Sequence, residues 1–205
     1  PKGSVEEKEY LKQKALEEAL KQQYYLEDPK FSFGNLENRC SLTAKKNSKG
    51  KMQWSIGYKA HFATDDHGVP LSYAITGASV HDSQCAIPLA KLVKQRLFFI
   101  LYVLGDKAYN SADINHFFET FTQAKFIADV KSNSKYELTP NEVERYKNRT
   151  TVERTNAELK ESFLPPVIYR RSAQARFEIS LAVLLTTVKM VERVIKAKGA
   201  TKNAA

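Results

Sequence analysis

The chain has 205 residues, 42% of them hydrophobic and 27% charged, which is enough apolar material for one core of ordinary size. Its formal net charge is +9, and residues 145–205, with 13 basic and 5 acidic side chains, hold +8 of it. The charge favours nucleic acid over a membrane as the partner, because no lipidation signal or basic amphipathic anchor accompanies it. The longest apolar run, residues 179–188, is too short to span a bilayer. We therefore expect a soluble protein without a membrane partner.

The two cysteines, Cys40 and Cys85, lack C-x-x-C spacing, and no secretory leader opens the chain. Both features favour a reduced, cytoplasmic setting. The first residue is Pro1 rather than a methionine. We therefore expect the chain to be a fragment.

Residues 1–52 are predicted to form an N-terminal helix and a loop arm. Ser4 and Glu7 have the spacing of a capping box, and helix-forming residues continue to Leu26. Residues 27–51 are rich in Pro, Gly, Asn, Ser and Lys, which predicts a long loop or a mobile arm. The lysines at 45, 46, 49 and 51 could contact phosphates, although a solvated surface is the simpler interpretation.

Strand signals begin at residue 53. Apolar and polar residues alternate over residues 53–63, Asp65–Gly68 supplies turn residues, and residues 69–77 read as the returning strand of a hairpin. Pro70 near its start suggests an edge strand or a first strand position. Residues 82–97 are predicted to form a helix that packs on the sheet.

Residues 98–104 are a nearly unbroken apolar run, which predicts a buried central strand covered on both faces. A helix is predicted at residues 111–121 and a strand at 125–130. A second helix is predicted to begin at Thr139-Pro140, and a final helix to span residues 172–198. A disordered tail is expected at 199–205. This order predicts an α/β fold, a mixed sheet flanked by helices.

Asp106 follows the apolar run 98–104 directly, after Gly105. Loops at the carboxyl ends of buried strands open onto the crevice where α/β folds place ligands, so Asp106 is a candidate site residue. The alternative is that Gly105-Asp106 only caps or turns the chain into the next helix. Position alone does not separate the two.

A second group of polar residues has helical spacing. Arg149, Glu153, Asn156 and Lys160 are separated by four, three and four residues, so a helix would place them on one face. They could form a surface ladder of ion pairs. However, Val152, Leu159 and Phe163 offer a separate face for packing, which leaves the polar face available for a cleft.

A strand-end Asp and a helix-borne Glu among cations suggest metal-assisted chemistry on phosphate. Mg²⁺ prefers oxygen ligands, and a pair of such ions about 4 Å apart can activate one oxygen and stabilise another. Signatures of competing chemistries are absent from the sequence: a phosphate-binding Gly-rich loop, a Gly-x-Ser-x-Gly elbow, and a His or Cys pair at zinc spacing.

Five ordered segments between residues 28 and 194 resemble the DDE transposases of bacterial insertion sequences, which are cut-and-paste enzymes with a ribonuclease-H-like catalytic domain. Four of the segments are Asp28–Gly34, Gly57–Asp65, Val80–Ser83 and Leu104–Ser111. The fifth is the most specific, because Tyr146-x2-Arg149-x3-Glu153-x6-Lys160 matches the family's Tyr-Arg-Glu-Lys signature in full.

The resemblance implies that Asp106 and Glu153 are the second and third catalytic acids and bind Mg²⁺ or Mn²⁺. It also implies that Tyr146, Arg149 and Lys160 position transposon-end DNA. The implied reaction is hydrolytic nicking at the ends of the element, followed by attack of the freed 3′-hydroxyl on target DNA. It further implies a bacterial, nucleoid-associated protein with residues 53–198 as a partial catalytic domain, and by analogy a homodimer in the synaptic complex.

The family's first catalytic Asp lies on a first strand that has no counterpart in this sequence. We therefore expect a ribonuclease-H-like sheet that lacks its first strand, and a chain that is inactive or nearly so by itself. Asp65 and Asp66 are the nearest substitutes, but they flank a turn. Two alternatives to a transposase stay open: a non-catalytic DNA-binding remnant or domesticated transposase, and an unrelated metal-dependent nuclease.

Overall fold

The computed structural model describes residues 5–47, 49–96, 99–129, 137–164 and 171–202. The expected Ser4 cap and the end of the C-terminal tail, residues 203–205, lie outside these ranges. The elements are α1 (Val5–Leu26), α2 (Pro29–Gly34), β1 (Ser41–Lys46), β2 (Met52–Thr64), β3 (Pro70–Gly77), α3 (Asp82–Lys94), β4 (Tyr102–Gly105), η1 (Lys107–Tyr109), α4 (Ala112–Phe117), η2 (Phe118–Thr122), β5 (Lys125–Ala128), α5 (Pro140–Tyr146), η3 (Lys147–Arg149), α6 (Thr150–Ser162) and α7 (Ser172–Lys202).

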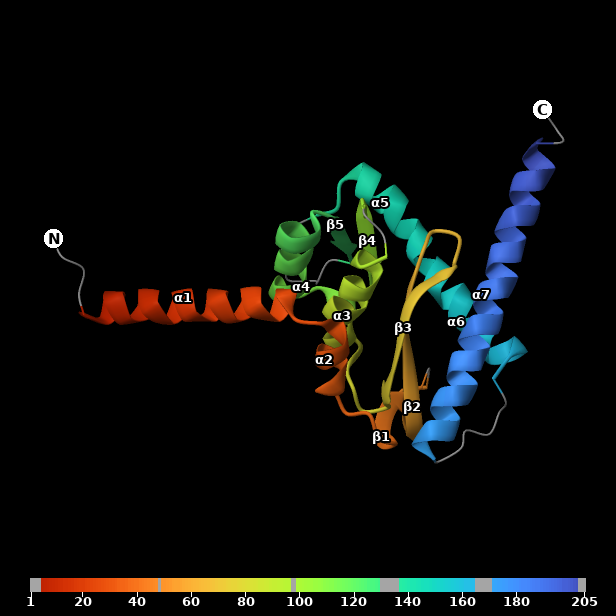
Figure 1. Ribbon diagram of the computed structural model, residues 1–205, viewed down its shortest axis with the longest axis horizontal. Coiled ribbons are helices and arrows are strands. Elements are labelled where there is room, and N and C mark those ends of the chain that lie inside the picture. Colours follow the sequence, from red (N-terminus) through yellow and green to blue (C-terminus); the bar gives the residue numbers. More distant parts are fainter. Residues whose placement is uncertain (1–4, 48, 97–98, 130–136, 165–170, 203–205) are drawn as a thin grey trace.

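The strands form two small sheets (Figure 1). In the first, the long strand β2 pairs with β1 through its first half and with β3 through its second half, both antiparallel. In the second, β4 and β5 pair in parallel, with Gly105 opposite Ala128. The chain is therefore α/β, as predicted, but the described residues form two separate sheets rather than one.

Helices cover both faces of the β2–β3 hairpin, because its side chains alternate between them. On one face, Ala74 packs in a cluster with Cys85 and Leu89 of α3. On the other, partly buried residues such as Phe62 and Ile75 pack against a cluster formed by α6 and α7, namely Leu159, Ile179, Ala182 and Val183. The hairpin is thus the middle layer of this part of the molecule.

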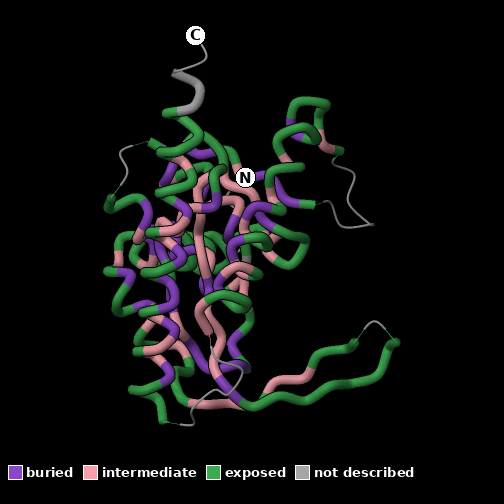
Figure 2. The backbone as a smooth tube through the Cα atoms, turned by 90° about the vertical axis from the view of Figure 1, so that its right-hand side faces the viewer, coloured by how far each residue is buried: buried purple, intermediate pink, exposed green. Residues whose placement is uncertain are grey.

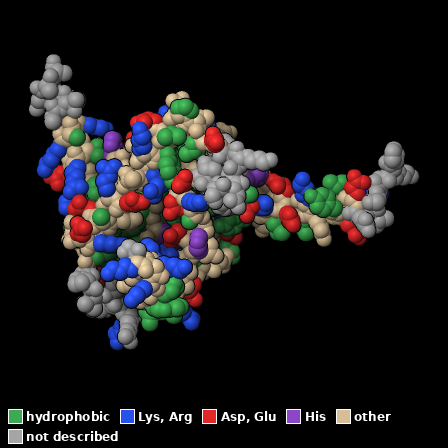
Figure 3. All heavy atoms as spheres, turned by 180° about the vertical axis from the view of Figure 1, so that it is seen from behind, with side chains coloured by type: hydrophobic (Ala, Val, Ile, Leu, Met, Phe, Trp, Pro, Cys, Tyr) green, Lys and Arg blue, Asp and Glu red, His purple; other side chains and the backbone are tan. Residues whose placement is uncertain are grey.

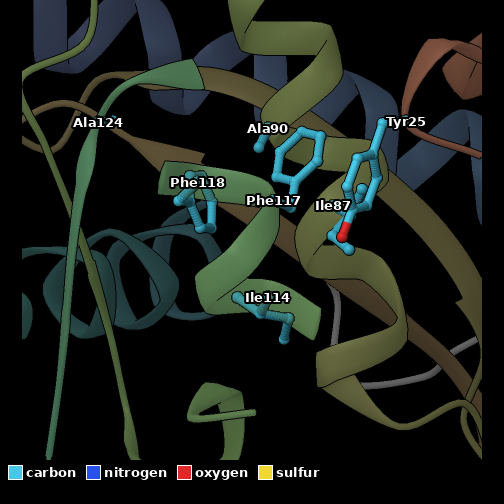
Figure 4. Packing of buried hydrophobic residues seen from close by; sticks show 7 residues of the cluster. All are labelled: Tyr25, Ile87, Ala90, Ile114, Phe117, Phe118 and Ala124. Atoms are coloured by element: carbon cyan, nitrogen blue, oxygen red, sulfur yellow. The ribbon is translucent and has the colours of Figure 1, made fainter. Parts of the chain in front are cut away.

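The main aromatic cluster lies beside the β4–β5 sheet and is drawn in Figure 4. Phe117 and Phe118, at the junction of α4 and η2, are at most 2% exposed. The Phe118 ring stacks on Phe126 of β5, with ring centroids 5.1 Å apart. Tyr25 from the end of α1 meets Phe117 edge to face. This packing fixes the position of the β4–β5 sheet.

Most of α1 extends away from the body (Figure 1), and only its last turns are anchored. Lys21 forms an ion pair of 2.9 Å with Asp113. The buried Lys91 ammonium donates hydrogen bonds to the carbonyl oxygens of Tyr24 and Glu27, at the point where α1 ends. Among the described residues, no helix is long and apolar enough to cross a membrane.

The predicted hairpin and helices are confirmed. Asp65 accepts hydrogen bonds from the backbone of His67 and Val69 and so holds the turn between β2 and β3. Thr139 caps α5 in a capping box with Glu142. Asp65 therefore has a structural role in the turn, which argues against it as a substitute for the first catalytic Asp.

The prediction of a loop arm over residues 27–51 was wrong for about half of that segment, because it contains α2 and β1. Asp28 accepts a hydrogen bond from the Lys30 amide and starts α2, with Pro29 in the first turn. β1 then forms by pairing with β2. Local composition did not reveal this strand because its stability comes from a partner beyond the next turn.

Two further expectations need correction. Residue 98 lies outside the described ranges. Within residues 99–104 the strand begins only at Tyr102, and Phe99 and Leu101 are 77% and 60% exposed, so this stretch is not a central strand covered on both faces. In the described part of the chain β4 has only β5 as a partner. The tail expected from residue 199 continues α7 as far as Lys202, because Ala and Lys favour helix and a single Gly costs only about 1 kcal/mol.

Candidate functional site

Asp106 lies at the carboxyl end of β4, where the strand turns into η1. Its Oδ1 accepts a hydrogen bond of 2.8 Å from the Ala108 amide, and the residue is exposed. The preceding Gly105 is buried, and a Cβ there would lie 2.9 Å from the Phe126 ring and 3.2 Å from the Tyr109 Cβ. Asp106 thus has the capping role that the sequence allowed, and it also presents its carboxylate at the strand end.

The second half of the site comes from the junction of α5, η3 and α6. Arg149 ends η3, and its Nη1 donates to Oε1 of Glu153, one turn later in α6, over 2.7 Å. The Arg149 guanidinium also lies 5.7 Å from the centre of the Tyr146 ring. Tyr146, Arg149 and Glu153 therefore form one connected group, and its Arg149–Glu153 contact is the ion pair that the helical spacing allowed.

The two halves meet because η3 packs against β4. The Arg145 guanidinium lies over the Tyr102 ring at 4.0 Å from its centre. Burial raises the pKa of Tyr146, and the charges of Asp129 and Asp106 raise it further. Burial lowers the pKa of Arg149, but its hydrogen bond to Glu153, helped by the charge of Asp106, leaves that pKa raised. Asp106 thus acts electrostatically on both residues of the helical group.

Lys160 is exposed on α6, seven residues after Glu153. Two helical turns separate the two residues, a rise of about 10 Å along the axis. Lys160 therefore lies on the helix that carries Glu153, but not in the hydrogen-bonded group formed by Tyr146, Arg149 and Glu153. A phosphate one or two nucleotides away from that group would be within its reach.

Asp129 is a site residue that the sequence did not single out. The parallel register that places Gly105 opposite Ala128 also places the residues that follow them, Asp106 and Asp129, at neighbouring strand ends. The Asn110 side chain donates to the Asp129 carbonyl over 3.2 Å. The sequence predicts a strand over residues 125–130, and the position of Asp129 near the end of that strand is the signal that could have identified it.

The donor chemistry of the site suits Mg²⁺ or Mn²⁺, because its acids offer hard carboxylate oxygens. The arrangement of these acids, however, meets fewer of the requirements of a metal site. Across the described ranges, no three His, Cys, Asp or Glu side chains are gathered closely enough to hold a metal ion. One oxygen of Glu153 is bound to Arg149. Asp106 and Glu153, which come from two different elements, thus offer oxygen atoms of the kind that such an ion binds.

A separate polar cluster joins β2 to the start of α3. The Asp82 carboxylate lies 3.3 Å from Nδ1 of the buried His61 and 3.2 Å from Nζ of Lys59. The hydrogen bond from His61 and the charge of Lys59 lower the pKa of Asp82 to about 2, against an opposing contribution from burial. Nε2 of His61 is 2.8 Å from the Thr76 hydroxyl. Every member of this cluster has a partner, so its role is structural.

Comparison with known proteins identifies one family. Neither the curated proteins nor the solved structures contain a match to the chain. A family model described as Transposase DDE domain matches residues 34–143, which is more than half of the chain and includes Asp106. With this match, the chain belongs to the transposase DDE domain family.

Proposed function

We propose that the protein is a transposase that cleaves DNA at the ends of an insertion sequence and transfers the freed strand to a target. The observation that carries the proposal is the meeting of Asp106, at the end of β4, with the group formed by Tyr146, Arg149 and Glu153. Membership of the transposase family supports DNA as its substrate. Work on DNA would place the protein at the bacterial nucleoid, as the sequence predicts.

The proposed roles follow from the chemistry of each side chain. Asp106 and Glu153 would hold Mg²⁺ or Mn²⁺, the kind of ion that transposases of this family generally use. When bound, such ions polarise the phosphate and activate the attacking oxygen. In the nicking step a water oxygen bonds to phosphorus, the bond from phosphorus to the 3′ oxygen breaks, and that oxygen leaves as a hydroxyl. In the transfer step the hydroxyl oxygen bonds to a phosphorus of target DNA and gives up its proton, while the 3′ oxygen of the target strand leaves and is protonated.

The other three residues would orient the DNA. The raised pKa of Tyr146 keeps its hydroxyl protonated, so it can donate a hydrogen bond to a phosphate oxygen. Arg149 stays charged and has the fork geometry that suits phosphate. Lys160 would contact the backbone farther along as a point charge.

We also propose the ribonuclease-H-like arrangement, in which a further strand that carries an Asp joins the two sheets. Among the described residues the second edge of β4 has no strand partner, which supports this proposal because strand edges are usually paired or covered. So do Phe99 and Leu101, large apolar side chains that are more than half exposed beside that edge.

The test is Mn²⁺ binding by calorimetry. We expect Asp106→Asn and Glu153→Gln each to weaken Mn²⁺ binding by about tenfold or more, because each removes a charged oxygen ligand. Glu119→Gln is the matched control, since Glu119 is an exposed acid of η2. Equal affinity in the wild type and both site variants would refute the assignment of the two ligands.

The second candidate is a DNA-binding protein without catalysis. It is favoured by the Arg149–Glu153 ion pair, which neutralises one of the two acids. A nicking assay on duplex DNA with Mn²⁺ tests the transposase against the non-catalytic DNA-binding protein. The remnant predicts DNA binding without any nicking. The transposase predicts slow nicking at most from this chain, and Glu153→Gln should remove it.

We propose that the protein acts as a homodimer, and an apolar stripe on α7 supports this. Its residues follow the 4-3-4-3-4 spacing of a coiled-coil seam and are 39–68% exposed: Phe177, Leu181, Leu184, Val188, Val191 and Ile195. The stripe is about 27 Å long, and contiguous apolar patches of this kind mark protein interfaces. A second copy of α7 has the same spacing and would cover it.

Sedimentation velocity tests the dimer. We expect the wild type to dimerise at micromolar concentration and the Leu184→Glu, Val188→Glu variant to be monomeric, because buried charge is costly at a seam. Leu11→Glu, Leu16→Glu on α1 is the control, since those leucines are equally exposed. A monomeric wild type, or a seam variant that still dimerises, would refute this interface.

A further inference from the structure

Strands β1 and β2 form a two-stranded ribbon that projects from the body (Figure 2). Ser41 pairs with Gly57 at the base and Lys46 with Met52 near the tip. Six residue pairs at about 3.3 Å per residue give a ribbon about 20 Å long. Beyond the base, from Tyr58 onward, β2 pairs with β3 instead of β1.

Hydrogen bonds at both ends fix the shape of the ribbon. At the base, the Gly57 carbonyl accepts from the Ala78 amide over 3.1 Å, and the Ser41 hydroxyl bonds that of Ser79 over 2.9 Å. At the tip, the Asn47 side chain accepts from the Lys49 and Lys51 amides, each over 3.0 Å. Gly50 has a φ of +75°, which a glycine tolerates. The ribbon is therefore a preformed element.

The tip carries positive charge without acids. Between Glu37 and Asp65 the sequence contains six basic residues and no Asp or Glu. Four of the six lie at the tip and are exposed: Lys45, Lys46, Lys49 and Lys51. No ion pair involves any of these four within the described ranges. In Figure 3, which views the molecule from behind, Lys and Arg side chains gather in the lower part of the face, where the ribbon projects.

The strand register divides the ribbon into two unlike faces. One face is apolar and carries Leu42 paired with Ile56 and Ala44 paired with Trp54. Trp54 and Ile56 are 64% and 71% exposed. The opposite face is polar. It pairs Thr43 with Ser55 and Lys45 with Gln53, and so offers hydroxyl, amide and ammonium groups. These groups are the ones that hydrogen-bond to base edges and phosphates.

We propose that this ribbon is a second DNA-binding site, separate from the strand-end carboxylates, and that it enters a groove of duplex DNA with its four tip lysines on the phosphates. A two-stranded ribbon fits the major groove, which is about 12 Å wide. The unpaired lysines complement the charge of the backbone. With the ribbon edge-on in the groove, its polar face meets one groove wall, and Trp54 and Ile56 on the opposite face meet the sugars of the other wall. The inference rests on the proposed function, because it takes DNA as the substrate.

The experiment measures duplex affinity by fluorescence anisotropy across a range of salt concentrations. The ribbon variant has Lys45, Lys46, Lys49 and Lys51 each changed to Ala. The control variant changes four exposed lysines of α1 and α2, namely Lys8, Lys12, Lys14 and Lys30, to Ala. Both variants lose four positive charges, so they separate a local site from a general effect of net charge. Thermal melting establishes that both are folded.

We expect the ribbon variant to bind duplex at least about tenfold more weakly at 0.1 M salt, with a salt slope smaller by up to about 3.6, at about 0.9 per lost phosphate contact. The control variant should stay close to the wild type. Equal losses in the two variants, or a ribbon variant that binds as the wild type does, would overturn the ribbon site and leave the proposed function intact. A wild type that does not bind duplex at all would overturn both.

Discussion

The strand-end site and the β1–β2 ribbon hold their charges in opposite ways. At the site, Arg149 is bound to Glu153, and Asp106 acts on both Tyr146 and Arg149, so cations and anions from several elements balance each other. On the ribbon, four lysines lie at one tip with no acid near them in the sequence. Balanced charge at the end of a packed sheet suits chemistry on a phosphate, whereas unbalanced charge on a projecting ribbon suits attraction of a polyanion.

The two regions also differ in how tightly they are packed, and a matched pair of glycine substitutions tests this. We expect Gly105→Ala to destabilise the fold by about 1–3 kcal/mol, because its Cβ would overlap the Phe126 ring, which stacking on Phe118 holds in place. In a chain of this length that corresponds to a drop in melting temperature of about 2–4 °C per kcal/mol.

Gly57→Ala, at the base of the ribbon, is the control for that substitution. A Cβ at Gly57 meets no atom within 4 Å. We therefore expect its melting temperature to stay within a degree or so of the wild type, since substitutions without a steric conflict change stability little. If both substitutions lowered the melting temperature equally, the result would contradict a difference in packing between the two regions.

The Lys160→Ala variant removes one cation near the strand-end site, so its salt slope of duplex binding can be compared with that of the ribbon variant, which lacks four. We expect the salt slope of duplex binding to fall by about 0.9, the value for one phosphate contact and a quarter of the effect of the ribbon variant. The same anisotropy titration measures it, with Lys30→Ala as the control. An unchanged slope would exclude Lys160 from the DNA interface.

The smallest expected effect concerns Asp82, whose charge is paired inside the body. Its folded pKa of about 2 lies below the ordinary value of 3.8 for this side chain. The pair therefore adds stability above about pH 4 that is lost as the pH falls towards 2. We expect about 1 kcal/mol or less, because the Asp82 side chain is 46% exposed and solvent screens it.

Urea unfolding of the wild type and of Asp82→Asn at pH 5 and pH 2.5 measures this contribution. The stability difference between the two proteins should be present at pH 5 and should shrink at pH 2.5. A difference of the same size at both pH values would argue against the pair. The ribbon variant should match the wild type in stability at both pH values, because its four lysines form no ion pair within the described ranges.

Local patterns predicted the elements whose signals are local. The alternation of β2, the Asp65 turn, the Thr139 cap and the position of Asp106 after a strand were all readable in the sequence. The four-residue spacing of Arg149 and Glu153 likewise indicated that they could form an ion pair. Each of these features depends on residues within one or two turns of each other.

What the sequence did not reveal depends on partners elsewhere. β1 became a strand because β2 pairs with it, although Lys45 and Lys46 read as part of a solvated loop. The apolar run before Asp106 is a strand over only four residues, since strand length is set by the available partner, and β5 pairs only from Tyr102. The sequence did not single out Asp129 for the same reason, because the register between two parallel strands cannot be deduced from the sequence of either strand alone.

Trp54 is the only tryptophan of the chain and lies on the ribbon, so its fluorescence reports on that element alone. The most direct test of the division between site and ribbon is acrylamide quenching of Trp54 with and without saturating duplex DNA, in the wild type and in the Asp106→Asn, Glu153→Gln variant. The account predicts that duplex protects Trp54 from quenching to the same extent in both proteins. Unchanged quenching while anisotropy shows the duplex bound would contradict it.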